Sequence, residues 1–202
     1  MGQAMTGTEF WSLARQTLFE PRLAAARILG MGLPLSAAWM GLALMAVLNT
    51  LVYTLSLQLG PPADPAAMSM TGPARDMPLL FSVMLFGGLA LTALALAHVG
   101  RFLGGQGGLA EIVPLLAWMQ ALRLLVQLGV VVLALAAPVL AALVVLVAAV
   151  WGVVILLVFV DEAHGLGGLF RAAGVVVVSI LALAVGLSLV IGLIGAPMIG
   201  RM

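Results

Sequence analysis

Long apolar stretches dominate the chain, and short polar or glycine- and proline-rich segments separate them. Five stretches, at residues 35–58, 77–100, 112–134, 139–160 and 172–196, contain at most one charged residue each. Each can cross the hydrocarbon core of a bilayer, which takes about 20 apolar residues in a helix. None alternates apolar and polar residues as a strand of a membrane barrel would. The pattern therefore predicts an all-α, polytopic membrane protein in which residues 35–202 form a domain of five transmembrane helices.

Residues 1–34 have a different pattern and are expected to form a cytoplasmic amphipathic arm. Apolar side chains recur there at helical spacing, at Phe10, Trp11, Ala14 and Leu18. Pro21 suits the first turn of a second short helix over residues 22–29. We interpret the arm as an interfacial helix on the membrane surface, with a frayed tail as the alternative.

The composition agrees with a membrane protein and excludes several functions. Hydrophobic residues make up 64% of the chain and charged residues 7%, and the mean hydropathy is +1.29. Cysteine is absent, which excludes disulfides and thiolate chemistry. The net charge of +1 offers no basic surface for nucleic acid. All eight cations are arginine and none is lysine, which with the many Ala, Gly and Leu residues suggests a GC-rich bacterial genome.

The arginines also predict an orientation. In a five-span topology, five arginines outside the spans lie on one side of the membrane, namely Arg15, Arg22, Arg27, Arg101 and Arg171. Two, Arg75 and Arg201, lie on the other side. The positive-inside rule then places the N-terminus in the cytoplasm and the C-terminus in the periplasm of a bacterial inner membrane.

Two motifs resemble nucleotide sites but lack the surrounding sequence that such sites need. Residues 161–164 read DEAH, as in helicases, yet the phosphate-binding loop of those enzymes requires a lysine that this chain lacks. Gly105 and Gly107 with Ala110 match a dinucleotide pattern, but they join two apolar spans instead of a strand and a helix. We interpret these glycines as permitting a sharp turn. No set of nucleophile, base and acid accompanies them, so we expect neither an enzyme nor a bound cofactor.

Charged and imidazole side chains gather at the cytoplasmic ends of spans two to five. They form a candidate contact surface made of His98, Arg101, Glu111, Asp161, Glu162, His164 and Arg171. Ion pairs among its charged members are the preferred interpretation, since charged ends are usual at a membrane boundary. A divalent metal site is the alternative, because imidazole and carboxylate groups are common ligands.

Arg123 is the one charge within a span, about 18 Å beyond Glu111 at 1.5 Å per residue. It shares a helical stripe with Gln120 and Gln127. A comparable stripe on the first span contains Asn49, Tyr53 and Ser56. We favour a buried polar clamp made of Gln120, Arg123, Gln127, Asn49 and Tyr53, with a polar pathway or anion site as the alternative.

Several short segments together resemble a known family. They are residues 20–22 (EPR) and 24–27 (AAAR), 98–107 (HVGRFLGGQG), 117–120 (AWMQ) and 159–165 (FVDEAHG). In this order, with five spans, the chain resembles bacterial members of the Yip (Ypt/Rab-interacting protein) domain family. The resemblance implies a five-helix membrane domain with a cytoplasmic N-terminus and supplies no catalytic residues. Eukaryotic members are linked to vesicle traffic and Rab-type GTPases, but their Asp-Leu-Tyr-Gly-Pro signature is missing here.

We therefore expect a non-enzymatic scaffold or adaptor that contacts lipids and other membrane proteins through its arm and cytoplasmic connectors. It would work within a larger complex or as a homo-oligomer. The alternative is a small transporter or channel subunit that uses the stripe of Gln120, Arg123 and Gln127. An intramembrane metalloenzyme centred on Asp161 and His164 is a more distant alternative.

Overall fold

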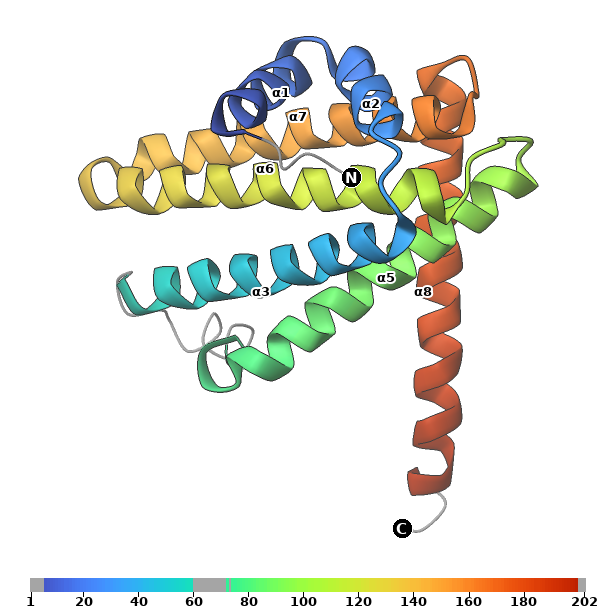
Figure 1. Ribbon diagram of the computed structural model, residues 1–202. Helices are drawn as coiled ribbons and strands as arrows, with labels where there is room; N and C mark the ends of the chain where they lie inside the picture. Colours follow the sequence, from blue (N-terminus) through green and yellow to red (C-terminus); the bar gives the residue numbers. More distant parts are fainter. Residues whose placement is uncertain (1–5, 60–71, 73, 200–202) are drawn as a thin grey trace.

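The structure, a computed structural model, describes residues 6–59, 72 and 74–199, the last ten of these by their backbone alone. The regular elements of the described residues are helices (Figure 1). They are α1 (Gly7–Phe19), α2 (Pro21–Gly30), α3 (Leu35–Leu59), α5 (Pro78–Phe102), α6 (Leu109–Ala136), α7 (Pro138–His164) and α8 (Leu169–Ile199). The prediction of an all-helical fold is confirmed.

Five of these helices, α3 and α5 to α8, are long and apolar enough to cross a membrane. Each overlaps one of the five apolar stretches, so the chain is a multi-pass membrane protein. Glu111 and Gly165 define the ends of two of these helices. At the start of α6, Glu111 accepts a hydrogen bond from the N–H of Gly108. At the end of α7, Gly165 adopts the left-handed conformation that terminates a helix.

The helices are arranged around the antiparallel pair of α6 and α7, which a tight turn at Ala137 connects (Figure 1). Helices α1 and α2 lie on one side of this pair, and α3 packs on α6 from the other side. Helix α5 packs on α3, and α8 contacts α5 and α7. Helix α8 runs at a steep angle to α6 and α7, and its distal half extends away from them (Figure 1).

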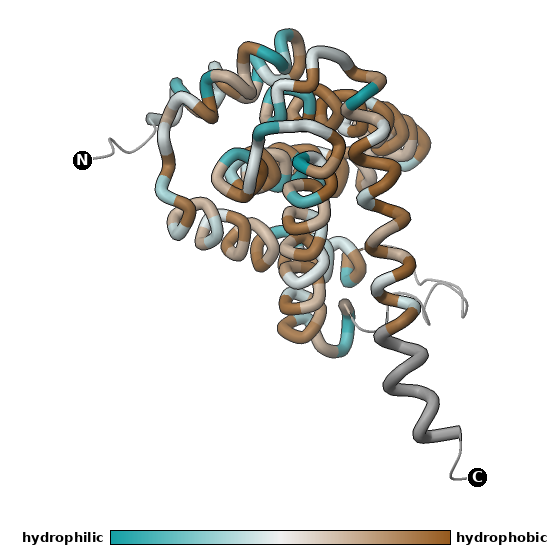
Figure 2. The backbone as a smooth tube through the Cα atoms, turned by 90° about the vertical axis from the view of Figure 1, so that its right-hand side faces the viewer, coloured by the Kyte–Doolittle hydropathy of each residue, from teal (hydrophilic) through white to brown (hydrophobic). Residues whose placement is uncertain are grey.

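The buried core lies near one end of the α6–α7 pair, which we call the connector end and define by residues 100–108 and 161–171. Its apolar residues come from all seven of the helices named above, among them Leu13, Ile28, Leu42, Leu96, Ile112, Phe159 and Val175. At the opposite end, Ala141 is the single buried residue between positions 121 and 154. We call residues 126–154 the hairpin end. Figure 2 shows hydrophilic residues concentrated in the arm and near the connector end, whereas α8 is mostly hydrophobic.

The arm is helical, but its buried side differs from the predicted one. Helix α1 buries Leu13, Ala14 and Thr17, and α2 buries Ala24, Ala25 and Ile28. Of the predicted apolar face, Trp11 and Leu18 are exposed. The reason is that the arm packs on α6 and α7, and the side that faces these helices is centred on Leu13, Thr17 and Ile28. An outward side that includes Trp11, Phe19 and Leu23 remains exposed.

Candidate functional site

The end of α7 is enclosed by α5 and by the connector between α5 and α6. His164 is 1% exposed, and its Nε2 lies 3.1 Å from the carbonyl oxygen of Leu96. The N–H of Gln106 donates to the carbonyl oxygen of His164 at 3.0 Å. These contacts attach the last residue of α7 to two neighbouring segments at once.

Glycines make this close approach possible. A Cβ atom at Gly105 would lie 2.7 Å from the Cβ of His164, which is too close. At Gly100 a Cβ would overlap the His164 ring, and at Gly107 it would overlap the carbonyl oxygen of Ala163. The sequence suggested a turn as the reason for these glycines, and only Gly104, with a φ of 92°, has the positive angle of such a turn in this connector. Contact with α7 is the reason for Gly100, Gly105 and Gly107.

Asp161 connects three elements. Its side chain is 3% exposed, and its Oδ2 lies 2.5 Å from Nη2 of Arg22 on α2. Its other oxygen, Oδ1, accepts the N–H of Gly168 at 2.8 Å, just before α8 begins. Its carbonyl oxygen accepts the N–H of Leu166 at 3.2 Å. One carboxylate therefore holds the arm, the end of α7 and the connector to α8 together.

The expected ion pairs between members of the contact surface are not found among the described residues. The ion pair found there instead joins Asp161 to Arg22, which belongs to the arm. The other charged groups bind backbone atoms instead. Arg101 Nε donates to the carbonyl oxygen of Gly107 at 3.1 Å, and Arg171 Nη1 donates to that of Leu166 at 3.2 Å. Glu111 Oε2 accepts the N–H of Gly108 at 2.7 Å. Helix ends and tight turns leave backbone groups unpaired, and these charges satisfy them.

The predicted contact surface is split by burial. His98, Arg101 and Arg171 are exposed, while Glu111 and Glu162 are half-buried. Asp161 and His164 are buried and cannot form part of a surface. The described residues contain no group of three His, Asp or Glu side chains placed to hold a metal ion.

The intramembrane polar residues come together only in part. Asn49 Nδ2 donates to the carbonyl oxygen of Gln120 at 3.1 Å, and Gln127 Nε2 donates to that of Asn49 at 3.5 Å. Arg123 is exposed beside this group, not inside it. Tyr53 stacks on Phe81 of α5, with ring centroids 5.8 Å apart. The helical stripe on α6 is wide enough that its glutamines face α3 while its arginine does not.

Three polar contacts among the described residues attach the arm to the α6–α7 pair, and sequence reasoning missed all of them. Besides Arg22–Asp161, the Nε1–H of Trp118 donates to Thr17 Oγ1 at 2.9 Å, and that of Trp151 donates to the carbonyl oxygen of Leu18 at 3.1 Å. Trp118 lies nine residues into α6, about 14 Å from its start. The arm is therefore fixed along the flank of two helices as well as at their end.

Comparison with known proteins gives one family. The model of the Yip1 domain matches residues 15–191, a range that begins in α1 and ends in α8. No curated protein and no solved structure matches the chain. The matched range includes the arm, both glycine-rich connectors and the residues that surround Asp161 and His164.

Proposed function

The chain belongs to the Yip1 domain family, and we propose that it acts as a non-enzymatic membrane scaffold or adaptor. The buried polar groups support this proposal because they serve packing. Asp161 joins three segments, His164 lies within hydrogen-bond distance of a backbone oxygen of α5, and the half-buried Glu111 caps the start of α6. Such bonds fix the relative positions of helices and connectors, as a scaffold requires.

The observation that carries the proposal is a pair of exposed aromatic rings at the connector end. Phe102, the last residue of α5, is 87% exposed, and Phe170, at the start of α8, is 93% exposed. Each is next in sequence to an exposed arginine, Arg101 or Arg171. Aromatic residues and arginine are enriched where proteins bind one another. We propose that these four residues contact a partner membrane protein.

We further propose that the protein resides in a bacterial inner membrane with its N-terminus and connector end in the cytoplasm. The support is the excess of arginines in the arm and the two connectors of that side. The chain has no cysteine, so single cysteines can be introduced without altering the background. A cysteine at Gln106 should be protected from a membrane-impermeant thiol reagent added to intact cells and should react after lysis. Reaction in intact cells would reverse the proposed orientation.

The alternative, a transporter or channel subunit, receives no support from the described contacts. Asn49 and Gln127 use their side-chain amide groups to join α3 to α6, and the backbone carbonyl oxygen of Gln120 accepts the bond from Asn49. Arg123 lies outside this group. The arrangement is typical of a contact between two packed helices and not of the lining of a channel.

The test is the recovery of partners from membranes in a mild detergent. The double variant Phe102→Ser/Phe170→Ser should lose a co-purifying membrane protein that the unchanged chain retains. The control, Leu143→Ser/Val147→Ser, removes two exposed apolar side chains at the hairpin end and should keep that protein. Recovery of the same proteins with both variants would contradict the role of the connector end.

A further inference from the structure

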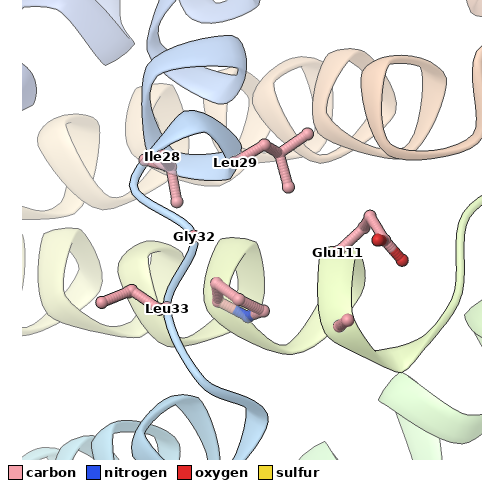
Figure 3. A pocket seen from close by; sticks show the side chains of 7 residues that line it. Ile28, Leu29, Gly32, Leu33 and Glu111 are labelled. Atoms are coloured by element: carbon pink, nitrogen blue, oxygen red, sulfur yellow. The ribbon is translucent and has the colours of Figure 1, made fainter.

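A hollow of about 240 Å³ lies between the arm and the beginning of α6 (Figure 3). It is lined by Ile28, Leu29, Gly32, Leu33, Ala110, Glu111 and Pro114. Glu111 is the one lining residue with a charged side chain, and its carboxylate lies to one side of the apolar lining side chains (Figure 3). The volume is smaller than the roughly 300–1,000 Å³ of sites for drug-sized ligands and suits a small head group.

Several features of the hollow favour a positive charge. Glu111 uses Oε2 for the N–H of Gly108, and a carboxylate has about four lone-pair positions, so it can accept further donors. Helix α2 ends at Gly30, and two of the lining residues, Ile28 and Leu29, belong to its last turn. The C-terminal end of a helix carries a partial negative charge, which attracts cations.

Proline adds an acceptor to the same hollow. Pro114 lies within the second turn of α6 and has no N–H, so the carbonyl oxygen of Ala110 lacks the donor that a helix normally supplies. Both residues line the hollow. Arg27, in the last turn of α2, is not the cation that these acceptors bind. Its Nη1 is directed toward Ser12 and Gln16 of α1, at 3.4 and 3.5 Å.

The surroundings of the hollow are apolar and exposed. Met31, Leu33 and Leu35 are all exposed in the segment that leads from α2 into α3, a membrane-spanning helix. This continuity with the lipid-facing surface favours a ligand that has an acyl chain over a free amine from the solvent. None of the lining residues is aromatic, whereas sites for quaternary ammonium groups use aromatic cages.

From this chemistry we infer that the hollow binds the primary ammonium head group of a phospholipid such as phosphatidylethanolamine. Glu111 and the Ala110 carbonyl oxygen accept its N–H groups, and Ile28, Leu29 and Leu33 contact the apolar part of the lipid. The inference is independent of the scaffold proposal, because it does not involve Phe102 or Phe170. A bound lipid would fix the segment between α2 and α3 against α6.

The test uses native mass spectrometry of the purified full-length chain in mild detergent. Phosphatidylethanolamine, phosphatidylcholine and phosphatidylglycerol with identical acyl chains are the probes. The unchanged chain should bind one phosphatidylethanolamine more tightly than the other two lipids. Glu111→Gln keeps an acceptor for Gly108 but loses the charge, and it should weaken this binding about tenfold. Glu162→Gln, a change of a half-buried carboxylate that does not line the hollow, should leave the affinity unchanged.

A second variant separates binding from folding. Pro114→Ala returns an N–H to α6 that can bond to the Ala110 carbonyl oxygen, so the helix should gain stability while lipid affinity falls. Equal binding of the three lipids by the unchanged chain, or full affinity in both Glu111→Gln and Pro114→Ala, would overturn the inference. Displacement of the lipid by free ethanolamine or by a lysine-containing peptide at comparable concentration would instead assign the hollow to soluble amines.

Discussion

The glycines of the connector end and those of the spanning helices show how differently two regions of this chain are built. A Cβ atom at Gly105 or Gly107 would come closer than 3 Å to atoms of α7. At Gly129 in α6 and Gly152 in α7, nothing lies within 4 Å of the corresponding position. The same residue type is required by packing in one region and is open to substitution in the other.

The difference extends to the polar groups and the core. The connector end buries Asp161 and His164 and binds them to three neighbouring segments. The hairpin end exposes large apolar side chains such as Leu135, Val139 and Val147. Lipid can cover an apolar helix surface without specific contacts, whereas a buried polar group needs defined partners. Specific structure is therefore concentrated in the connector end, and substitutions there should have the largest effects.

The largest effect is expected from Gly107→Ala. The new methyl group would overlap the backbone of Ala163, which cannot rotate away as a side chain could. Forced overpacking of this kind costs about 1–3 kcal/mol, and we expect a value near the upper limit. Thermal unfolding in detergent, followed by circular dichroism, measures the loss. The matched control Gly129→Ala should be neutral or stabilising by up to about 1 kcal/mol. Equal loss in both variants would remove the distinction between the two regions.

A smaller loss is expected when the arm is detached from the connector end by Arg22→Met. The buried Asp161 carboxylate would keep the N–H of Gly168 but lose its cation. Arg22 is itself exposed, so we expect a loss of about 1–2 kcal/mol, less than for a fully buried pair. Hydrogen exchange of the α2 amides should also become faster. Arg15→Met removes an exposed arginine of α1 that has no described ion pair and should change stability little.

The double variant Arg22→Met/Asp161→Asn sharpens this experiment. Asparagine is neutral and can still accept the Gly168 N–H, so no uncompensated charge remains buried. The double variant should be more stable than Arg22→Met alone. If it is less stable, the carboxylate stabilises the connector end by a route other than its pairing with Arg22.

The two regions also differ in how far sequence could predict them. Five stretches of apolar residues predict long helices because length and hydropathy are local properties, and the structure confirms a helical membrane protein. The pairs Trp118–Thr17 and Arg22–Asp161 join residues 101 and 139 positions apart, and no local pattern reports such contacts. Helical spacing placed Gln120, Arg123 and Gln127 on one stripe, but it could not show which part of the stripe faces α3. Only the structure shows that Arg123 is exposed and lies outside that contact.

Trp118→Phe tests whether polar attachment of the arm matters beyond the connector end. The change keeps an aromatic ring near Phe10, whose ring centroid lies 5.2 Å from that of Trp118, but removes the N–H that Thr17 accepts. A single neutral hydrogen bond contributes about 1 kcal/mol, which sets the expected loss of stability. Trp39→Phe, on α3, is the control because Trp39 packs edge-on against Phe86 without a described hydrogen bond. Loss of similar size in both variants would mean that indole volume, and not the hydrogen bond, is what stabilises the arm.

The smallest effect concerns the N-terminus of α1, which is exposed and distant in sequence from the connector end. Glu9 Oε2 accepts hydrogen bonds from the backbone N–H and from the hydroxyl of Thr6, both at 2.8 Å. These bonds hold the pKa of Glu9 below its usual value. A lowered pKa in the folded state means that the stabilisation is present above the unfolded-state pKa and is lost as pH falls through the folded-state pKa. Acidification from neutral pH to about pH 3 should therefore loosen the first turn of α1.

Hydrogen exchange of the α1 amides at the two pH values, corrected for the intrinsic pH dependence of exchange, measures this change. Glu9→Gln keeps an acceptor for the Thr6 N–H but has no proton to gain, so the protection of its first turn should not depend on pH in this range. Amides of α7 near Asp161 provide an internal reference, since their exchange reports the connector end. If acidification removes as much protection from the first turn of α1 in Glu9→Gln as in the unchanged chain, a group other than Glu9 governs the acid response.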